Sequence, residues 1–307
     1  FAVGRRGGLD RTGSLLGGGL GGVAPVAEGL AVGERVYGYL PAGSELIITP
    51  GKIRPDSFID AAEHRAGLAA VYNRYERCPA GPGDNPAREA AQMVLQPLFL
   101  TSFLIDAHLR DTDFSGATRI VLTSASSKTA LALAFLLKRG RPEGVSIEGL
   151  TSARNTGFVK DSGLYDAVIA YDDIERMDPA PARLIVDFAG SAGVNRALHT
   201  RLADSLKANI RVGGAHWEQS APARDLPGPR PTFFFAPDDA RKRIAEWGPE
   251  GFAQRQGEAW SQFAAAADAL LAWRSLDGPQ EALSAYQALV GGEVAASEAL
   301  VVEVSAR

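Results

Sequence analysis

The stretch TRIVLTSASSKTALALAFLLK, residues 118–138, determines the fold class predicted for this chain. Its apolar run at 120–122 is typical of a buried strand, and the apolar spacing after residue 128 is typical of an amphipathic helix. Small hydroxylated residues join the two. A strand, a short turn and a helix N-terminus in this order open a doubly wound α/β sheet, and such a helix N-terminus is a ready site for a phosphate.

The same alternation continues along the chain. It predicts strands at 120–124, 145–152, 167–171, 184–188 and 210–213, and helices at 127–139, 154–162 and 191–207. Alternation of this kind predicts parallel strands joined by right-handed crossovers. Before it the patterns predict a strand at 34–40 and helices at 60–78 and 86–109, and after it helices at 257–274 and 279–290 and a strand at 299–304. The predicted class is α/β, with a β-rich domain and a doubly wound parallel-sheet domain.

The composition is that of a soluble globular protein large enough for two domains. With 22% charged residues and a net charge of -4, it offers no electrostatic case for nucleic acid or an anionic membrane as partner. No apolar run approaches the roughly 20 residues that cross a bilayer. One cysteine, Cys78, excludes an intrachain disulfide and fits a reducing compartment. We expect a cytoplasmic protein with a small-molecule substrate, and a homodimer stays open.

Glycines crowd residues 4–33, including two runs at 17–19 and 21–22. Because glycine loses the most backbone freedom on folding, this composition disfavours regular structure there. A phosphate-binding loop is the alternative, although no strong strand precedes these glycines.

Several motifs resemble the medium-chain dehydrogenase/reductase superfamily, in particular its zinc-free quinone oxidoreductases. Residues 33–38, GERVYG, look like the GDRV-type strand of that family's GroES-like domain. Residues 187–191, DFAGS, resemble its fourth Rossmann strand and the following turn, and residues 211–214, RVGG, resemble the next strand. Four strings look like an uncharacterised bacterial and fungal branch: LQPLFLTSFLIDAHL, LTSASSKTALALAFLLK, YDDI and VGGAHW.

The resemblance implies a GroES-like domain over 1–62, a Rossmann domain with its linking helices over 63–235, and a return to the first domain over 236–307. It also implies NADP(H)-dependent oxidoreductase activity without zinc. The family's N-terminal half is longer than the 33 residues that precede Glu34, so part of the substrate wall is expected to be absent or divergent. The family's catalytic zinc needs cysteine, histidine and carboxylate ligands, and four histidines and one cysteine make a metal site unexpected.

The turn after the first Rossmann strand departs from the family pattern. The A-x-x-G-x-x-G motif becomes SASSKTA here, so no glycine stands where the pyrophosphate would approach the backbone. We predict that hydroxyls, backbone N–H groups and one ammonium replace the glycines. The predicted contacts are Ser124, Ser126, Ser127, Lys128 and Thr129, and helix capping by the serines is the alternative.

The end of the second strand carries no carboxylate, which an NAD-preferring site would use to hold the ribose hydroxyls. It offers Ser152, Arg154 and Asn155 instead, so NADP is the cofactor that we expect, with a solvated arginine as the alternative. Gly190 and Gly213 are the two further residues expected at the cofactor.

Three residues are candidates for handling a proton. His216 follows the glycines at 213–214, where a ring could approach the nicotinamide. Tyr72 lies three residues from Tyr75 on one face of the predicted helix at 60–78 and could supply a hydroxyl acid. Tyr39 lies two residues from Tyr37 on one face of a strand and could line a cleft. Packing is the alternative for each of the three.

The predicted function is an NADP(H)-dependent, zinc-independent oxidoreductase acting on a small carbonyl or activated alkene. Two alternatives stay open because the phosphate turn lacks glycine: a Rossmann-like enzyme without a dinucleotide, of lyase or decarboxylase type, and a non-catalytic binding protein.

Overall fold

The computed structural model describes residues 2–4, 18–22, 28–31, 33–40, 46–68, 72–78, 86–212 and 225–303. The chain forms two compact units. The first unit comprises Phe1–Leu98 and Ala264–Arg307, and the second unit comprises Phe99–Phe263. The two units are groups of residues in contact, and the domain boundaries expected at residues 62 and 235 stay predictions.

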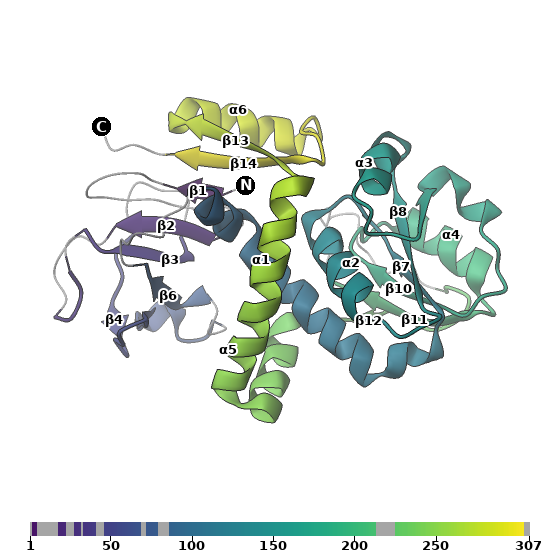
Figure 1. Cartoon of the computed structure of the whole chain (residues 1–307), viewed down its shortest axis with the longest axis horizontal. Coiled ribbons are helices and arrows are strands. Elements are labelled where there is room, and N and C mark those ends of the chain that lie inside the picture. Colours follow the sequence, from purple (N-terminus) through teal and green to yellow (C-terminus); the bar gives the residue numbers. More distant parts are fainter. Residues whose placement is uncertain are drawn as a thin grey trace. The chain divides into compact units, whose positions relative to one another are not determined.

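A six-stranded parallel sheet forms the centre of the second unit (Figure 1). Its order is β12-β11-β10-β7-β8-β9, and the predicted α/β class is confirmed. The strands are β7 Arg119–Leu122, β8 Ser146–Thr151, β9 Ala167–Ala170, β10 Arg183–Asp187, β11 Leu206–Arg211 and β12 Thr232–Phe233. Apolar residues at the centre of β7 and β10 have no exposed surface, which explains why these strands read as continuous apolar runs.

Three helices connect neighbouring strands of this sheet. They are α2 Lys128–Gly140, α3 Thr156–Asp161 and α4 Ala192–Leu202. The helix predicted over 191–207 is too long, because α4 ends at Leu202 and β11 begins at Leu206. Leu198, Leu202 and Leu206 follow one another at a helical spacing of four residues, and all three are buried in one core cluster. The first two belong to α4 and the third to β11, so the apolar spacing alone does not show where the helix ends.

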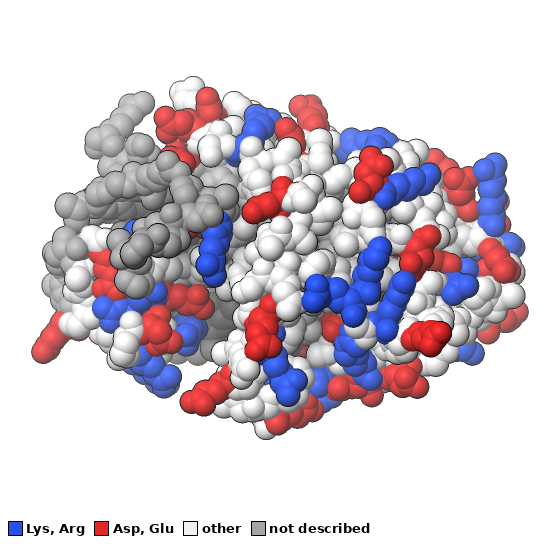
Figure 2. All heavy atoms as spheres, in the orientation of Figure 1, with Lys and Arg blue, Asp and Glu red and all other residues white. Residues whose placement is uncertain are grey.

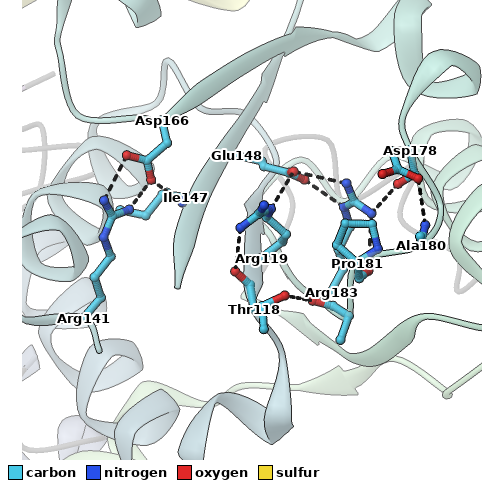
Figure 3. A network of polar contacts seen from close by, with 11 residues as sticks. Thr118, Arg119, Arg141, Ile147, Glu148, Asp166, Asp178, Ala180, Pro181 and Arg183 are labelled. Atoms are coloured by element: carbon cyan, nitrogen blue, oxygen red, sulfur yellow. Dashed lines mark hydrogen bonds and ion pairs between the residues drawn. The ribbon is translucent and has the colours of Figure 1, made fainter. Parts of the chain in front are cut away.

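Charged side chains connect the amino ends of neighbouring strands of the parallel sheet (Figure 3). Arg183 at the start of β10 donates from Nε and Nη2 to both oxygens of Glu148 on β8, at 2.8 and 3.1 Å. Arg119 at the start of β7 lies 3.8 Å from the same carboxylate. Asp166 accepts from the Ile147 N–H at 2.7 Å and pairs with Arg141. We call this set the amino-edge ion pairs.

Two long helical elements, α1 Pro86–Asp111 and α5 Ala236–Leu270, contribute residues to both units, and α5 consists of two helices that meet at a kink at Gly248, where φ is +73°. Within the second unit, Phe99 stacks on Phe263 with ring centroids 5.3 Å apart, and Phe135 of α2 contacts Phe263 at 5.4 Å. Among the described residues one helical segment, Arg88–Asp111, is long and apolar enough to cross a membrane by length and composition. Half of the most apolar window of this segment is buried, and fully buried side chains such as Phe99 pack in the core, so the expectation of no membrane partner stays a prediction.

The first unit contains a five-stranded antiparallel sheet with the order β2-β3-β6-β5-β4. Its strands are β2 Gly18–Gly22, β3 Arg35–Tyr39, β4 Pro50–Gly51, β5 Ser57–Asp60 and β6 Arg74–Arg77. The helix predicted over 60–78 is wrong. Among its described residues, 60–68 and 72–78, this region holds the 3₁₀ turn η1 Glu63–Arg65, a 3₁₀ residue at Tyr72 and the strand β6. The stacking of Tyr75 on Phe58 across the β5–β6 pair, at 5.4 Å between ring centroids, outweighs local helix preference.

Glycines at 18–22 form a strand, so the prediction of no regular structure is wrong for this part. β2 pairs residue by residue with β3 in an antiparallel ladder. The pairing is between backbones, so it does not need side chains on β2. Gly38 of β3 has its own reason, since a Cβ there would lie 2.5 Å from the Tyr75 ring. A separate three-stranded parallel sheet joins β1 Ala2–Gly4, β14 Glu298–Glu303 and β13 Ala272–Asp277, and α6 Gly278–Val290 packs on it.

Candidate functional site

The turn between β7 and α2 has a left-handed residue at its start. Ser124 has φ +47°, a conformation that residues with a side chain rarely adopt. The Ala125 N–H donates to the Leu150 carbonyl at 2.9 Å, and the Ser127 N–H donates to the Ser124 carbonyl at 2.7 Å. Ser127 then caps α2, because its hydroxyl accepts from the Ala130 N–H at 3.2 Å. The capping alternative thus holds for Ser127, and its predicted phosphate contact stays a prediction.

Two tyrosines hold this turn from different parts of the chain. The Tyr165 hydroxyl donates to the Ala125 carbonyl at 2.8 Å. The Ser124 N–H donates to the Tyr171 oxygen, also at 2.8 Å. Gly149 makes room for the first tyrosine, since a Cβ at this position would lie 2.7 Å from the Tyr165 ring. Neither tyrosine was predicted from the sequence, because both contacts link residues 40 or more apart.

Ser126 connects the turn to the end of β8. Its hydroxyl oxygen accepts from the Thr151 hydroxyl at 3.3 Å and from the Asn155 amide at 3.1 Å. Two of the predicted site residues, Ser126 and Asn155, are therefore brought together. A hydroxyl that accepts twice keeps its proton to donate, so Ser126 is prepared to bind an anionic oxygen.

The neighbouring segment 152–155 is polar and carries no carboxylate. Ser152 is half-buried at the start of a 3₁₀ turn, η4 Ala153–Asn155, and Arg154 is exposed. Lys128 and Thr129 are half-buried at the first two positions of α2. Both residues stand at the N-terminus of α2, where the helix dipole favours negative charge.

A buried carboxylate organises the turn after β10. Asp187 Oδ1 accepts from the Thr123 hydroxyl at 2.7 Å and from the N–H groups of Ala189 and Gly190, both at 3.1 Å. Thr123 accepts in turn from the Phe188 N–H at 2.9 Å. Gly190 has φ +64°, which favours glycine at this point of the turn. The carboxyl ends of β7 and β10 are thereby joined by direct hydrogen bonds.

Side-chain amides extend this network into the core. Asn195 donates to Asp187 Oδ2 at 2.6 Å, and Asn209 donates to Asn195 Oδ1 at 2.8 Å. Asn209 Nδ2 also lies 2.8 Å from His199 Nε2, and His199 Nδ1 lies 2.8 Å from the Pro227 carbonyl. Since the Pro227 carbonyl offers only an acceptor, Nδ1 of the fully buried His199 is the donor in this contact.

Burial has the largest effect on the pKa of Tyr171 and raises it, whereas the hydrogen bonds with Ser124 lower it. Burial also raises the pKa of Tyr165 well above its ordinary value. Both phenols are therefore neutral at physiological pH, and the hydrogen bonds that hold the turn do not depend on pH in this range.

The predicted proton-handling residues fall in different places. Tyr39 and Tyr72 contact each other edge to face at 5.4 Å, and both are 41% exposed. Because β6 replaces the predicted helix, Tyr72 lies beside this strand and not on a helix face with Tyr75, which is fully buried. His216 and Gly213 lie outside the described residues. The roles of all four site predictions stay predictions.

Cysteine and metal chemistry find no support in the part of the chain that the structure describes. Burial, followed by the charge of Glu76, raises the pKa of the Cys78 thiol to about 11, so the reactive thiolate is scarce at neutral pH. Among the described residues no group of three histidine, cysteine or acidic side chains could hold a metal ion.

With a six-stranded parallel sheet and a small antiparallel sheet, the fold of this chain is similar to that of several solved structures with a Rossmann and a GroES-like domain. The YhdH oxidoreductase from Salmonella enterica in complex with NADP is 13% identical, with a TM-score of 0.51 over 94% of this chain and 81% of that one. YhdH from E. coli K-12 with bound NADPH is 14% identical, with a TM-score of 0.50 over 93% and 80%. A mutant enoyl thioester reductase from Candida tropicalis is 10% identical, with a TM-score of 0.51 over 92% and 78%.

The model of a family described as "Protein of unknown function (DUF2855)" matches residues 22–295. The chain belongs to that family. A comparison with curated proteins finds no match.

Proposed function

We propose that the protein is an NADP(H)-dependent, zinc-independent oxidoreductase acting on a small carbonyl or activated alkene. One observation carries the proposal. The hydroxyl- and cation-bearing turn at the start of α2 is hydrogen-bonded, through Ser126 and Asn155, to a strand end without a carboxylate. The two YhdH structures have a similar fold and contain NADP or NADPH, which supports NADP(H) as the cofactor.

The residues at the turn fit a pyrophosphate in the absence of glycine. Ser126 has a proton to donate, Thr129 adds a second hydroxyl and Lys128 adds an ammonium, all at the N-terminus of α2. No acidic side chain occurs between residues 118 and 142 to repel a phosphate. Ser124 and Ser127 would shape the turn, because their backbone and hydroxyl groups already bond within the protein.

The adenosine end would be read at the end of β8. Arg154 is exposed there and would pair with a 2′-phosphate, assisted by Ser152 and Asn155. An NAD-specific site would instead place a carboxylate at this strand end. Gly190, after β10, would lie along the dinucleotide, and Gly213 is the second glycine that we propose for this contact.

When bound, NADPH supplies the hydride, and the chain has to supply or remove the proton. His216, Tyr39 and Tyr72 are the candidates for that role. Zinc independence is supported by the small number of cysteine and histidine residues, one and four respectively. The single cysteine also supports a cytoplasmic location. Charged side chains of both signs are interspersed on the face shown in Figure 2, which supports a small-molecule partner over a polyanion.

Isothermal titration with NADPH and NADH tests the proposal. We expect NADPH to bind much more tightly than NADH. Arg154→Ala should weaken NADPH binding by about 10- to 100-fold, because a charge-assisted contact with the 2′-phosphate is lost. It should change NADH binding little, because NADH has no 2′-phosphate. Arg176→Ala is the matched control, since Arg176 is 84% exposed and pairs with Asp173. Equal losses for both dinucleotides would remove the assignment of Arg154.

A second function is favoured by a separate observation. Ser127 caps its own helix and the Ser124 N–H is taken by Tyr171, so two groups that a glycine-rich turn offers to a phosphate are already used. This favours an enzyme of lyase or decarboxylase type, or a binding protein, without a dinucleotide. Absence of binding by both dinucleotides would support it, and turnover of a carbonyl and acid panel without cofactor would then separate the enzyme from the binding protein.

A further inference from the structure

The turn that replaces the glycine-rich motif has a conformational difficulty at Ser124. Its φ of +47° lies in the left-handed region, where a Cβ is crowded by the following carbonyl. Ser124 directly follows the buried β7 and Thr123, so the chain cannot move away without disturbing the contact between Thr123 and Asp187. Something outside the turn has to favour the left-handed form.

Tyr171 is positioned to do this. It begins the 3₁₀ segment η5 Tyr171–Arg176 directly after β9, and its ring packs against the core cluster that contains Val121 and Leu150. From that anchored position its oxygen accepts the Ser124 N–H at 2.8 Å. The tyrosine lies 47 residues from Ser124 in sequence, so its position is set by the sheet and not by the turn itself.

We propose that Tyr171 is a positioning residue, which holds Ser124 in the left-handed form and thereby sets the phosphate-binding end of α2. The consequence for the cofactor rests on the proposed function above. The effect on the turn does not. Tyr165 supports the next residue through the Ala125 carbonyl, but it is deeply buried under Gly149 and its loss would disturb the core.

The proposal predicts a specific compensation. Glycine adopts left-handed conformations readily, so Ser124→Gly should make the turn independent of Tyr171. If only a fraction of molecules has the competent turn, the apparent dissociation constant rises by the inverse of that fraction. Tyr171→Phe should therefore weaken NADPH binding, and Ser124→Gly should restore it in the double variant. A residue that served only the stability of the core would give no such rescue.

The experiment is NADPH titration of the full chain carrying Tyr171→Phe, Ser124→Gly, both changes, or Tyr286→Phe. We expect about a tenfold rise in the dissociation constant for Tyr171→Phe, near 1.4 kcal/mol, and recovery to within about threefold in the double variant. Tyr286 is a matched control because it lies partly exposed on α6 in the first unit. An unchanged dissociation constant in Tyr171→Phe, or no recovery in the double variant, overturns the proposal.

Hydrogen exchange without cofactor separates this proposal from the proposed function. Deuterium uptake in peptides covering residues 122–127 should rise in Tyr171→Phe and fall back in the double variant, with no change in peptides from β5 and β6. If wild type binds no dinucleotide but this pattern appears, the proposed function fails and the positioning role stands. If uptake at 122–127 is the same in Tyr171→Phe and wild type, the positioning role fails whatever the cofactor result.

Discussion

The two edges of the parallel sheet in the second unit are built from different chemistry. At the amino edge, charged side chains pair directly, with Arg183 and Glu148 both buried and joined by two hydrogen bonds (Figure 3). At the carboxyl edge, hydroxyls, amides and backbone N–H groups form the network around Asp187 and the turn at Ser124. At the amino edge the described charged side chains thus pair with one another.

The difference indicates a division of roles. Ligands of open α/β sheets bind at the carboxyl ends of the strands, where helix N-termini point. At that edge the protein keeps Ser126 able to donate and Arg154 exposed. We therefore expect changes at the amino edge to affect stability alone, and changes at the carboxyl edge to affect stability and dinucleotide binding together.

Glu148→Ala should have the largest effect. It leaves Arg183 buried without its carboxylate partner, which costs about 3–5 kcal/mol. Urea unfolding measures the loss, and NADPH titration of the protein that remains folded should give the wild-type dissociation constant. A loss below about 1 kcal/mol, or a large change in NADPH affinity, would contradict the division between the two edges.

Thr123→Val should have the second largest effect. The change keeps the shape of the side chain but removes the acceptor of the Phe188 N–H and one donor to Asp187, at a cost of about 1–3 kcal/mol. Unlike Glu148→Ala, it should also weaken NADPH binding, because it loosens the turn before Gly190. Thr118→Val at the amino edge is the control, since the Thr118 hydroxyl donates to the Ala182 carbonyl at a long 3.5 Å and at an exposed position. Equal effects of the two valines would argue against the comparison.

Acid should weaken the amino edge through Asp166. The hydrogen bond from Arg141 lowers the pKa of Asp166 below its ordinary value of 3.8. Between the folded and the unfolded pKa of Asp166, the folded state binds fewer protons than the unfolded state. The stabilisation that the ionised Asp166 gives is therefore complete above about pH 4 and is lost as the pH falls through the folded pKa. Unfolding free energies measured from pH 5 to pH 2.5 should fall less steeply in Asp166→Asn than in wild type. Parallel curves would show that Asp166 has no such role.

Arg119→Ala should have the smallest effect, about 0–1 kcal/mol. The Arg119 side chain is 37% exposed and its Nε lies 3.8 Å from Glu148, so solvent screens the interaction. Thermal unfolding measures the change. A loss as large as that of Glu148→Ala would mean that the charges of Arg119, Glu148 and Arg183 act as a single unit.

Local patterns were enough to predict much of this fold. The apolar run of β7 followed by the apolar face of α2 predicted a strand, turn and helix, and the repeated alternation predicted a parallel sheet. Local patterns failed where pairing between distant strands decided the structure. The segment that became β6 was predicted as a helix, because its partner β5 and the stacking of Phe58 on Tyr75 are not visible in a single stretch of sequence.

The candidate site divides in the same way. The sequence by itself determined that the turn after β7 is rich in hydroxyls, lacks glycine and precedes a helix, and that the end of β8 lacks a carboxylate, because these are properties of consecutive residues. Only the tertiary structure decided that Tyr165 and Tyr171 hold this turn, that Asn155 meets Ser126, and that Asp187 joins two strand ends. Each of these contacts joins residues from 29 to 64 positions apart, and only the packing of the parallel sheet brings them within hydrogen-bond distance.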